Sequence, residues 1–346
     1  MTAPDAVANA AAAQMHKAAI VIDATCPLAN RTEYLDEWVA GGATAIAPSL
    51  DASGGVDRAM RGIARWLGAL AQQPHRLIHV TRADDVLRAK REGKLGIIFH
   101  FQNTDPVEDD LGLLAVYQRL GIRMIQLTYN RKNRVGDGCE ERTDAGLSRF
   151  GVGLIKEMNR VGIVVDLSHT GYRTTMDAIE CSEAAPVFSH SNCKVLCDSP
   201  RNITDEQIRA VAQRGGLIGM NGYPAFVARV PRPTLDQFVA HIEHITGLVG
   251  PDHVGLGIDY YEGMAGIMPP DQAAREYERL IASGIWTSTT YPPPPWHYPE
   301  GLERPSGFPT LTAALAARGY SMFDIQKILG GNWLRVFGQV WGGAVR

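Results

Sequence analysis

The chain has 346 residues, of which 45% are hydrophobic and 21% charged, and its formal net charge is −3. This composition is typical of a globular protein with a large core. The absence of a basic surplus argues against nucleic acid and against a membrane surface as partners, and no segment is long and apolar enough to predict a membrane span. The five cysteines are odd in number and irregularly spaced, which favours a cytoplasmic location over a disulfide framework.

The first residues are rich in alanine. They lack the basic start and the long apolar run of a secretory signal peptide. We therefore expect a flexible or weakly helical lead-in over residues 1–16, followed by one domain over residues 17–346.

Short apolar runs recur along the chain and predict eight strands. Each run is continuously apolar rather than alternating, as in strands of a parallel sheet that are buried on both faces. The predicted strands are Ala18–Asp23, Thr44–Leu50, Leu95–Gln102, Met124–Tyr129, Gly162–Ser168, Pro186–His190, Leu217–Asn221 and Val254–Asp259.

Amphipathic stretches lie between most of these runs and predict helices. The predicted helices are Asp109–Leu120, Phe150–Arg160, Thr204–Gln213, Leu235–Leu248, Met322–Leu329 and Asn332–Val340. The third begins with the T-x-x-Q pattern of a capping box. Eight strand-and-helix units fit a barrel or a doubly wound sheet. The count of eight, together with the lack of a G-x-G-x-x-G motif after the first strand, favours a (β/α)8 TIM barrel.

Two long connections interrupt the repeat. Residues 129–148 follow the fourth predicted strand, and residues 262–309 follow the eighth and contain the stretch PPPPWHYP, which favours an extended backbone. Long loops at these positions of a barrel usually shape the substrate pocket.

Polar residues at the C-terminal ends of barrel strands face a common pocket. The residues at these positions are Asp23, Thr25, Gln102, Tyr129, Asp166, His169, His190, Asn221 and Asp259. Imidazoles from two consecutive strands, His169 and His190, are suited to binding zinc or iron, and Asp259 could complete the site or accept a proton from bound water. The alternative is that each histidine only caps a strand and that Asp259 caps a helix or forms a loop ion pair.

Two further residues allow two interpretations each. Arg201 precedes a predicted helix, where its guanidinium could hold a substrate carboxylate in bidentate fashion or pair with a neighbouring acid. Cys26, near the predicted pocket, could be a ligand or nucleophile, but a small apolar filler is the simpler interpretation.

From about Lys94 to Val340 the chain resembles the membrane (renal) dipeptidase family. The resemblance rests on LGxxxxYQxLGIRxxQLTYN from Leu111 to Asn130, GLSRFG from Gly146, EMNRVGIVVDLSH from Glu157, PVFSHSN from Pro186, PRNITDEQIRAV from Pro200, HVGLGIDY from His253 and GGNWLRVF from Gly330. These motifs are long and collinear. The resemblance implies a metal-dependent dipeptidase on a (β/α)8 TIM barrel of the metal-dependent hydrolase type.

The resemblance also implies roles for individual residues. The two strand-end histidines that hold one of the family's two metals correspond to His169 and His190, and the aspartate that serves the other metal and the attacking water corresponds to Asp259. The arginine that holds the substrate carboxylate corresponds to Arg201.

This sequence departs from the family pattern at four positions. Where the first strand of the family carries D-G-H-x-D, this chain has Thr25 in place of the histidine and Pro27 in place of the second aspartate. The bridging glutamate of the third strand corresponds to Gln102, and the histidine after the fourth strand corresponds to Tyr129. Proline offers no side-chain ligand and a neutral amide cannot hold two dications together, so we expect one metal ion, zinc, rather than two.

Together these features predict a hydrolase of a small amide or dipeptide with a free carboxylate. The predicted metal ligands are His169, His190 and Asp259, the predicted catalytic residues are Asp259, Tyr129 and Gln102, and the predicted substrate contacts are Arg201, Tyr129 and Asn221. The substituted ligand positions favour an alternative, a non-peptidase enzyme on the same barrel that acts on a carboxylated metabolite with one metal or none. A binding protein without catalysis is a third reading, and the retained histidines argue against it. The family resemblance also suggests a homodimer.

Overall fold

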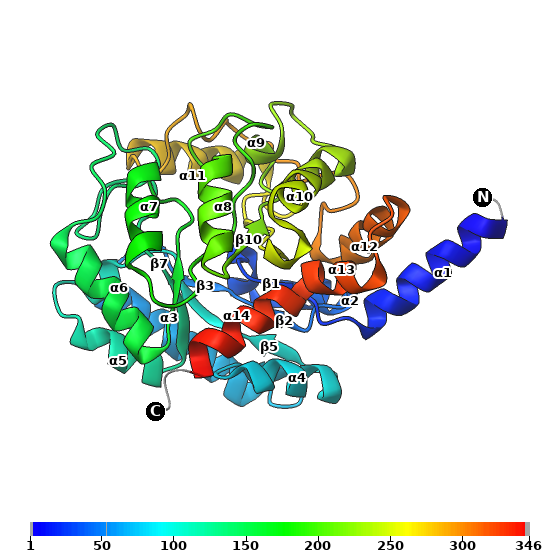
Figure 1. The fold of residues 1–346 in the computed structure, drawn as a ribbon, viewed down its shortest axis with the longest axis horizontal. Coiled ribbons are helices and arrows are strands. Elements are labelled where there is room, and N and C mark those ends of the chain that lie inside the picture. The colour runs from blue at the N-terminus through cyan, green and yellow to red at the C-terminus, as the bar shows by residue number, and fades with distance from the viewer. Residues whose placement is uncertain (1–2, 53, 343–346) are drawn as a thin grey trace.

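The computed structural model describes residues 3–52 and 54–342 as an α/β protein with one curled parallel sheet of eleven strands (Figure 1). The strands are β1 (Ile22–Asp23), β2 (Ala45–Ile46), β3 (Ser49–Asp51), β4 (Leu77–His79), β5 (Leu95–Ile97), β6 (Phe99–Phe101), β7 (Ile122–Gln126), β8 (Val164–Asp166), β9 (Val187–Phe188), β10 (Leu217–Met220) and β11 (Val254–Leu256). Their order across the sheet is β3-β6-β7-β8-β9-β10-β11-β1-β2-β5-β4. Neighbours in the chain are therefore mostly neighbours in the sheet.

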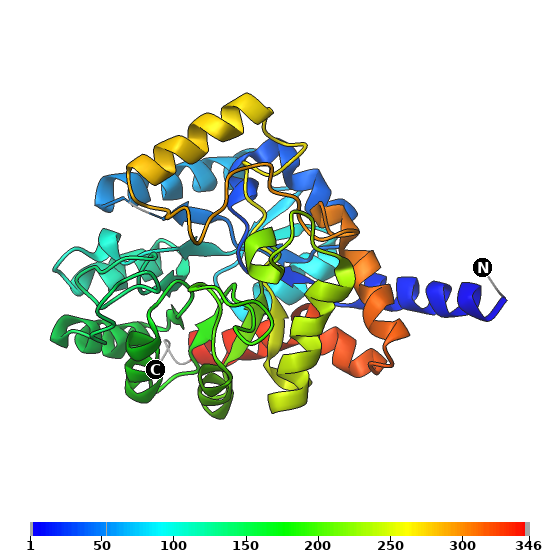
Figure 2. The same cartoon turned by 90° about the horizontal axis from the view of Figure 1, so that it is seen from above.

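Helices surround this sheet when the molecule is seen from above (Figure 2). They are α1 (Ala3–Ala18), α2 (Leu35–Ala40), α3 (Val56–Gln72), α4 (Ala83–Glu92), α5 (Gly112–Arg119), α6 (Arg149–Val161), α7 (Tyr172–Cys181), α8 (Asp205–Gln213), α9 (Pro224–Val227), α10 (Leu235–Val249), α11 (Pro270–Ala282), α12 (Phe308–Ala317), α13 (Met322–Gln326) and α14 (Asn332–Trp341). The predicted capping box of α8 is confirmed, because Thr204 and Gln207 exchange side-chain and backbone hydrogen bonds.

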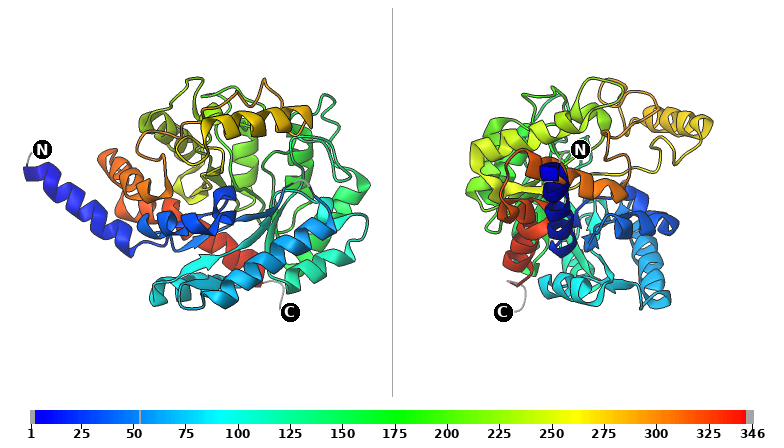
Figure 3. Two further views of the ribbon diagram at one scale, coloured as in Figure 1. Left: turned by 180° about the vertical axis from the view of Figure 1, so that it is seen from behind. Right: turned by 90° about the vertical axis from the view of Figure 1, so that its right-hand side faces the viewer.

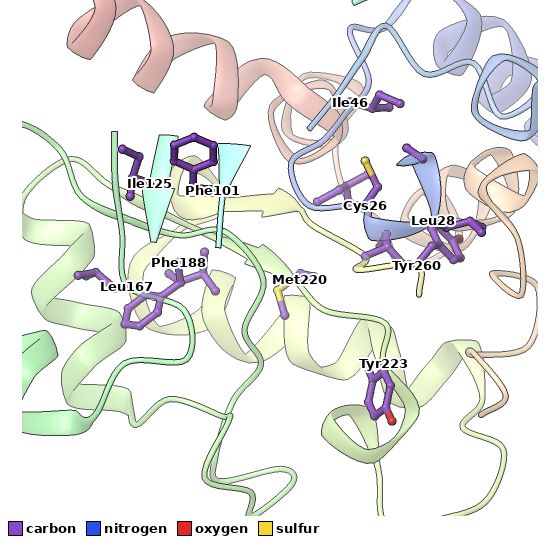
Figure 4. Close-up of a cluster of buried hydrophobic side chains, with 14 of the residues drawn as sticks. Cys26, Leu28, Ile46, Phe101, Ile125, Leu167, Phe188, Met220, Tyr223 and Tyr260 are labelled. Carbon is purple, nitrogen blue, oxygen red and sulfur yellow. The ribbon is translucent and has the colours of Figure 1, made fainter. Parts of the chain in front are cut away.

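Both faces of the sheet are buried, which explains why apolar residues stand at consecutive positions of most strands. Met124, Val164 and Val187 pack on one face in a cluster that includes residues of α14. Their sequence neighbours Ile125 and Phe188 pack on the other face in a second, larger cluster, where Figure 4 shows them with Phe101 and Leu167.

Helix α14 closes the end of the sheet where the strands begin. Trp333 donates a hydrogen bond from Nε1 to the carbonyl of Leu256, and Trp341 donates one to the carbonyl of Arg123 at the start of β7. The side chain of Asn332 donates to the carbonyl of Val254. In Figure 1 and in both panels of Figure 3, α11 lies on the side of the molecule away from α14. The loops and α11 therefore lie at the other end of the sheet, near the C-terminal ends of the strands.

The N-terminal segment is helical, which is one of the two forms expected for the lead-in over residues 1–16. Helix α1 runs from Ala3 to Ala18, two residues beyond the expected bound, and projects from the body of the molecule (Figure 1). Its last turn is anchored, because the imidazole of His16 makes hydrogen bonds to the Thr312 hydroxyl and to the Gly41 carbonyl. Residues 1 and 2 lie outside the described part.

Other differences concern element bounds. Two predicted strands are each divided by a short interruption, into β2 and β3 and into β5 and β6. Strand β4 was not predicted, and the long connection after β11 contains helix α11 rather than only an extended loop.

None of the described helices is both long and apolar enough to cross a membrane. All five cysteines are free. Cys26 is fully buried beside Leu28 and Ile46 (Figure 4), and burial raises the pKa of its thiol well above the usual value. This environment is that of an apolar filler.

Candidate functional site

The predicted site residues gather at the C-terminal ends of the strands. Gln102, Tyr129, His169 and Asp259 line one cavity of about 550 Å³. His169 also lines an adjoining cavity of about 360 Å³, and there it is joined by Arg201. His190 contacts His169, and Asn221 contacts Asp259. The structure therefore brings all seven predicted residues into one region.

The two histidines face each other through their Nε2 atoms, which are 2.9 Å apart. Both side chains are buried, with exposed fractions of 4% for His169 and 0% for His190. His169 has a left-handed backbone with φ of 61°, which is uncommon for a residue other than glycine and often marks a functional site. This backbone places its ring against the neighbouring strand end.

Hydrogen bonds at the other ring nitrogens fix where the protons are. His169 Nδ1 lies 2.6 Å from Oδ1 of Asn130, an oxygen that can only accept, so Nδ1 carries the proton. Nδ2 of Asn130 donates to the Ile285 carbonyl and to the Tyr291 hydroxyl, which agrees with this orientation of the amide. The Nε2 atom of neutral His169 is consequently an unprotonated acceptor.

The same reasoning applies to His190. The Ser189 hydroxyl donates to Oδ2 of Asp166 at 2.5 Å and lies 2.6 Å from His190 Nδ1, so its oxygen accepts the Nδ1 proton. Thr25 donates its own proton to the Ala24 carbonyl and can only accept from the same Nδ1, at 3.3 Å. Neutral His190 therefore also presents an unprotonated Nε2.

Asp166 is ionised in this arrangement. Burial tends to raise the pKa of its carboxyl, but interactions with His100, His190 and Ser189 outweigh burial and lower the pKa to about 2. The carboxylate also accepts hydrogen bonds from the backbone amides of Ser168 and Ser189. It can therefore act only as an acceptor for the Ser189 hydroxyl.

Two facing lone pairs 2.9 Å apart repel each other unless a cation lies between them. Burial lowers the pKa of both imidazoles well below the usual value, and the charge of Arg201 lowers it further, so a shared proton is disfavoured. The pair is thus arranged as metal ligands usually are, with the second ring nitrogen of each histidine held by a hydrogen bond.

A third ligand of the usual kind is not gathered with this pair. Within residues 3–52 and 54–342, no three His, Cys, Asp or Glu side chains lie close enough to hold one metal ion. Asp259 Oδ2 is instead 3.4 Å from the Asn221 amide nitrogen. The role of Asp259 as a metal ligand stays a prediction.

Asp259 has the properties of a group that can gain and lose a proton near neutral pH. Burial raises the pKa of its carboxyl, the charge of Arg201 and the hydrogen bond from Asn221 lower it, and the result is about 7. Its backbone is also left-handed, with φ of 63°. A pKa near the working pH is what a general base needs.

Arg201 is a buried cation, with an exposed fraction of 2%. One guanidinium nitrogen donates to the His190 carbonyl at 3.2 Å, the guanidinium carbon lies 5.2 Å from the centre of the Phe226 ring, and Nε has no acceptor. In the described part of the chain no carboxylate is within ion-pair distance of it. A buried guanidinium in this state can bind an anion from solution.

Tyr129 stacks on His169, with ring centres 4.1 Å apart. Burial raises the pKa of its phenol to about 12, so the hydroxyl keeps its proton at neutral pH. Because Trp286 donates to this oxygen at 3.4 Å, the Tyr129 proton is directed to another acceptor. Tyr129 is therefore a hydrogen-bond donor at the edge of the cavity.

Several residues of the site were not predicted. Ser189 and Asn130 lie inside motifs that carried the family resemblance, but nothing in their spacing indicated a role for the side chains. Tyr223 and Trp286 line the cavity from the segments after β10 and α11. The approach of these segments depends on tertiary packing, which leaves no periodic signal in the sequence.

Comparisons with known proteins found a matching family model and several relatives. The family model described as membrane dipeptidase, peptidase family M19, matches residues 12–286 and 295–343. "Dipeptidase tcpJ" of Claviceps purpurea is 30% identical over 262 residues, which are 75% of this chain and 54% of that protein. An "uncharacterized protein in pqqA 5'region" of Klebsiella pneumoniae is 29% identical over 282 residues, 79% of this chain and 92% of that protein.

A solved structure is also similar. An amidohydrolase from Pseudomonas aeruginosa superposes with a TM-score of 0.85 at 31% sequence identity, covering 96% of this chain and 99% of the other. The chain thus spans about half the length of the fungal dipeptidase and nearly all of the two bacterial proteins.

Proposed function

The chain belongs to the membrane dipeptidase family, peptidase family M19, and from this membership we propose that it hydrolyses the amide bond of a dipeptide or a similar small molecule with a free carboxylate. The observation that carries the proposal is the pair of unprotonated Nε2 atoms, 2.9 Å apart, beside a cavity that also contains Asp259 and Tyr129. The buried guanidinium of Arg201 adjoins them. The substrate, the metal content and the residue roles below are parts of this proposal.

His169 and His190 fit one divalent ion, and we assign zinc. Their nitrogens are close enough for one ion at the usual Zn–N distance of about 2.0–2.1 Å to contact both. The first-strand positions do not fit a second ion, because Thr25 is turned to His190 Nδ1 and Pro27 has no ligand atom. When bound, zinc supplies a Lewis acid and lowers the pKa of its water to about 7.

Arg201 is the proposed partner of the substrate carboxylate. It is buried and adjoins the histidines, and the described part of the chain gives it no carboxylate. A charged bidentate pair would supply both affinity and orientation. This contact would place the scissile amide next to Tyr129 and Asp259.

The remaining residues have proposed roles in proton transfer and charge stabilisation. Asp259 accepts the proton of the attacking water and returns it to the leaving amine, and Asn221 orients its carboxylate. Tyr129 donates a hydrogen bond to the oxygen on which negative charge develops. The Gln102 amide lines the same cavity and helps to position substrate.

We further infer that the curled sheet is a (β/α)8 barrel. Residues 45–51 and 95–101 would each form one barrel strand that is interrupted near its middle. The pairings support this reading, since β1 pairs with β2 and β11, β2 with β5, β3 with β6, and β6 with β7. Strand β4 would then be an addition outside the barrel, beside β5.

The substituted ligand positions favour one alternative, a non-peptidase enzyme acting on a carboxylated metabolite. Gln102 is neutral and Pro27 has no ligand atom, so water activation would differ from that in the two-metal members of the family. A homodimer and a cytoplasmic location also stay predictions.

Elemental analysis and a dipeptidase assay on the full chain test the proposal. We expect one equivalent of zinc per chain after loading and dialysis, release of amino acids from dipeptides, and loss of both on His169→Ala. His244→Ala is the control, because that imidazole is partly exposed and pairs with Asp205. It should leave the zinc content and the activity unchanged.

Zinc binding without turnover of any dipeptide would favour the non-peptidase alternative. A protein that binds no zinc after loading would contradict the proposed metal site.

A further inference from the structure

One wall of the 550 Å³ cavity is basic. Arg58, Arg61 and Arg65 lie three and four positions apart on α3, which places them on one face of the helix. All three line the cavity, and Arg31 joins them from the segment after β1. Nothing in the resemblance or in the roles assigned above accounts for this row.

Arginines outnumber carboxylates along the described lining of the cavity. The charged residues there are Arg31, Arg58, Arg61, Arg65, Arg279, Asp259, Glu262 and Glu276. Arg279 and Glu276 form a bidentate pair, with distances of 2.6 and 2.8 Å, and neutralise each other. Arg31 pairs with Glu33, which lies outside the lining, at 3.0 Å. Arg61 and Arg65 on α3 are the basic groups of this wall that can attract an anionic ligand.

The partners of Arg61 and Arg65 in the described part of the chain leave the charge of these two arginines available to a ligand. Arg61 pairs with Asp57 on the surface, where both side chains are about 80% exposed, and such pairs contribute little and exchange readily. Arg65 donates to the amide oxygen of Asn30, a neutral acceptor. Glu262 faces Arg31 and Arg65, but no ion pair joins them within the described residues.

Another part of the cavity lining is aromatic and uncharged. Tyr223, Tyr261, Trp286 and Tyr291 line it, and Trp286 and Tyr291 stack with ring centres 4.4 Å apart. These rings can contact many side chains through apolar surface. Discrimination between charged and neutral substrates therefore depends on the arginines of α3.

We propose that Arg61 and Arg65 of α3 select substrates with an anionic group on the acyl side of the scissile amide, such as an N-terminal glutamate or aspartate. This inference rests on the proposed hydrolase function. With the C-terminal carboxylate on Arg201 and the amide beside Tyr129 and Asp259, the acyl half extends into the cavity whose wall is α3. A carboxylate there meets Arg61 and Arg65, whereas the neutral amide of glutamine does not gain the same attraction.

The test compares Glu-Ala with Gln-Ala, in both configurations of the alanine, on the zinc-loaded full chain. We expect kcat/KM to be about tenfold higher for Glu-Ala at low salt, as two partly exposed charge contacts would give, and the preference to shrink at 0.5 M salt. The double variant Arg61→Gln/Arg65→Gln should lose most of the preference, and Arg61→Lys/Arg65→Lys should keep it. Arg119→Gln, an exposed arginine on α5 outside the cavity, is the matched control.

Equal kcat/KM for the two dipeptides, or a preference unaffected by the glutamine variants, would overturn the inference and leave the hydrolase proposal intact. Turnover of neither dipeptide would instead count against the hydrolase proposal. In that case the affinity of the Asp259→Asn variant for each dipeptide, measured by calorimetry, still decides the question. Tighter binding of Glu-Ala that depends on Arg61 and Arg65 supports the basic wall, and equal binding overturns it.

Discussion

A single hydroxyl determines which nitrogen of His190 is free to bind a metal. Ser189 donates to Asp166 and accepts from His190 Nδ1, so the free lone pair is on Nε2. The amide oxygen of Asn130 accepts the Nδ1 proton of His169 and so leaves the Nε2 lone pair of that ring free. Partners of this kind typically change metal affinity by about 10–100-fold when they are removed.

Ser189→Ala should therefore weaken zinc binding by at least about tenfold, because His190 loses the acceptor that fixes its tautomer. Competition with a chromophoric chelator measures this affinity directly. Ser182→Ala is the control, since Ser182 is also buried and hydrogen-bonded, to the Ala184 carbonyl, but lies outside the site. Equal zinc affinity in the Ser189 variant and the wild type would remove the proposed role of the hydroxyl.

At this scale the sequence predicted the residues with ionisable or ligating side chains and missed their supports. His169, His190 and Asp259 lie at the ends of predicted strands, and parallel strands end at one edge. Arg201 was singled out because it precedes a predicted helix. Ser189 and Asn130 have ordinary side chains whose importance comes from what they contact. Only the fold brings Asp166, Ser189 and His190 into one chain of hydrogen bonds.

At the scale of elements, β11 and the segment after it are packed against the strand end that carries His190. A Cβ atom on Gly257 would lie 1.8 Å from the Ser189 carbonyl oxygen and 3.5 Å from His190 Cα. The absence of a side chain at this position thus permits the close approach of two strand ends.

Gly257→Ala should lower the free energy of unfolding by at least about 2 kcal/mol, because the added methyl forces these backbones apart. It should also weaken zinc binding, since His190 moves with Ser189. Urea unfolding of the metal-free protein measures the first effect. The control Gly247→Ala lies in α10 with no atom within 4 Å of the new Cβ, and it should be neutral or stabilising by up to about 1 kcal/mol. If the two variants had equal stability, the proposed close packing at Gly257 would be wrong.

The strands were predictable as a set, but their bounds were not. Each continuous apolar run that predicted a strand contains at least one strand of the structure, because both faces of the sheet are buried. Strand β4 was missed because it is only three residues long, Leu77–His79, and lies at one end of the strand order. Helix α11 was missed because the proline-rich stretch nearby suggested an extended loop for the whole connection.

At the scale of the whole molecule, one end of the sheet stabilises the fold and the other carries the candidate site. Helix α14 packs its aromatic side chains against the end where strands begin, and this packing stabilises the fold. The cavity lies at the other end, where His169 and Arg201 are buried and Asp259 is partly buried, yet all three keep free hydrogen-bonding or metal-binding atoms. Buried polar groups of this kind are costly to the fold and are typical of functional sites.

The number of metal ions is the property on which the proposed chemistry depends. Crystals of the zinc-loaded chain, measured at the zinc absorption edge, would show bound ions as anomalous peaks. We predict one peak, in contact with Nε2 of both His169 and His190, and none beside Thr25 and Pro27. A map without a peak at the two histidines, in which their rings touch each other directly as neutral imidazoles, would contradict the proposed metal site.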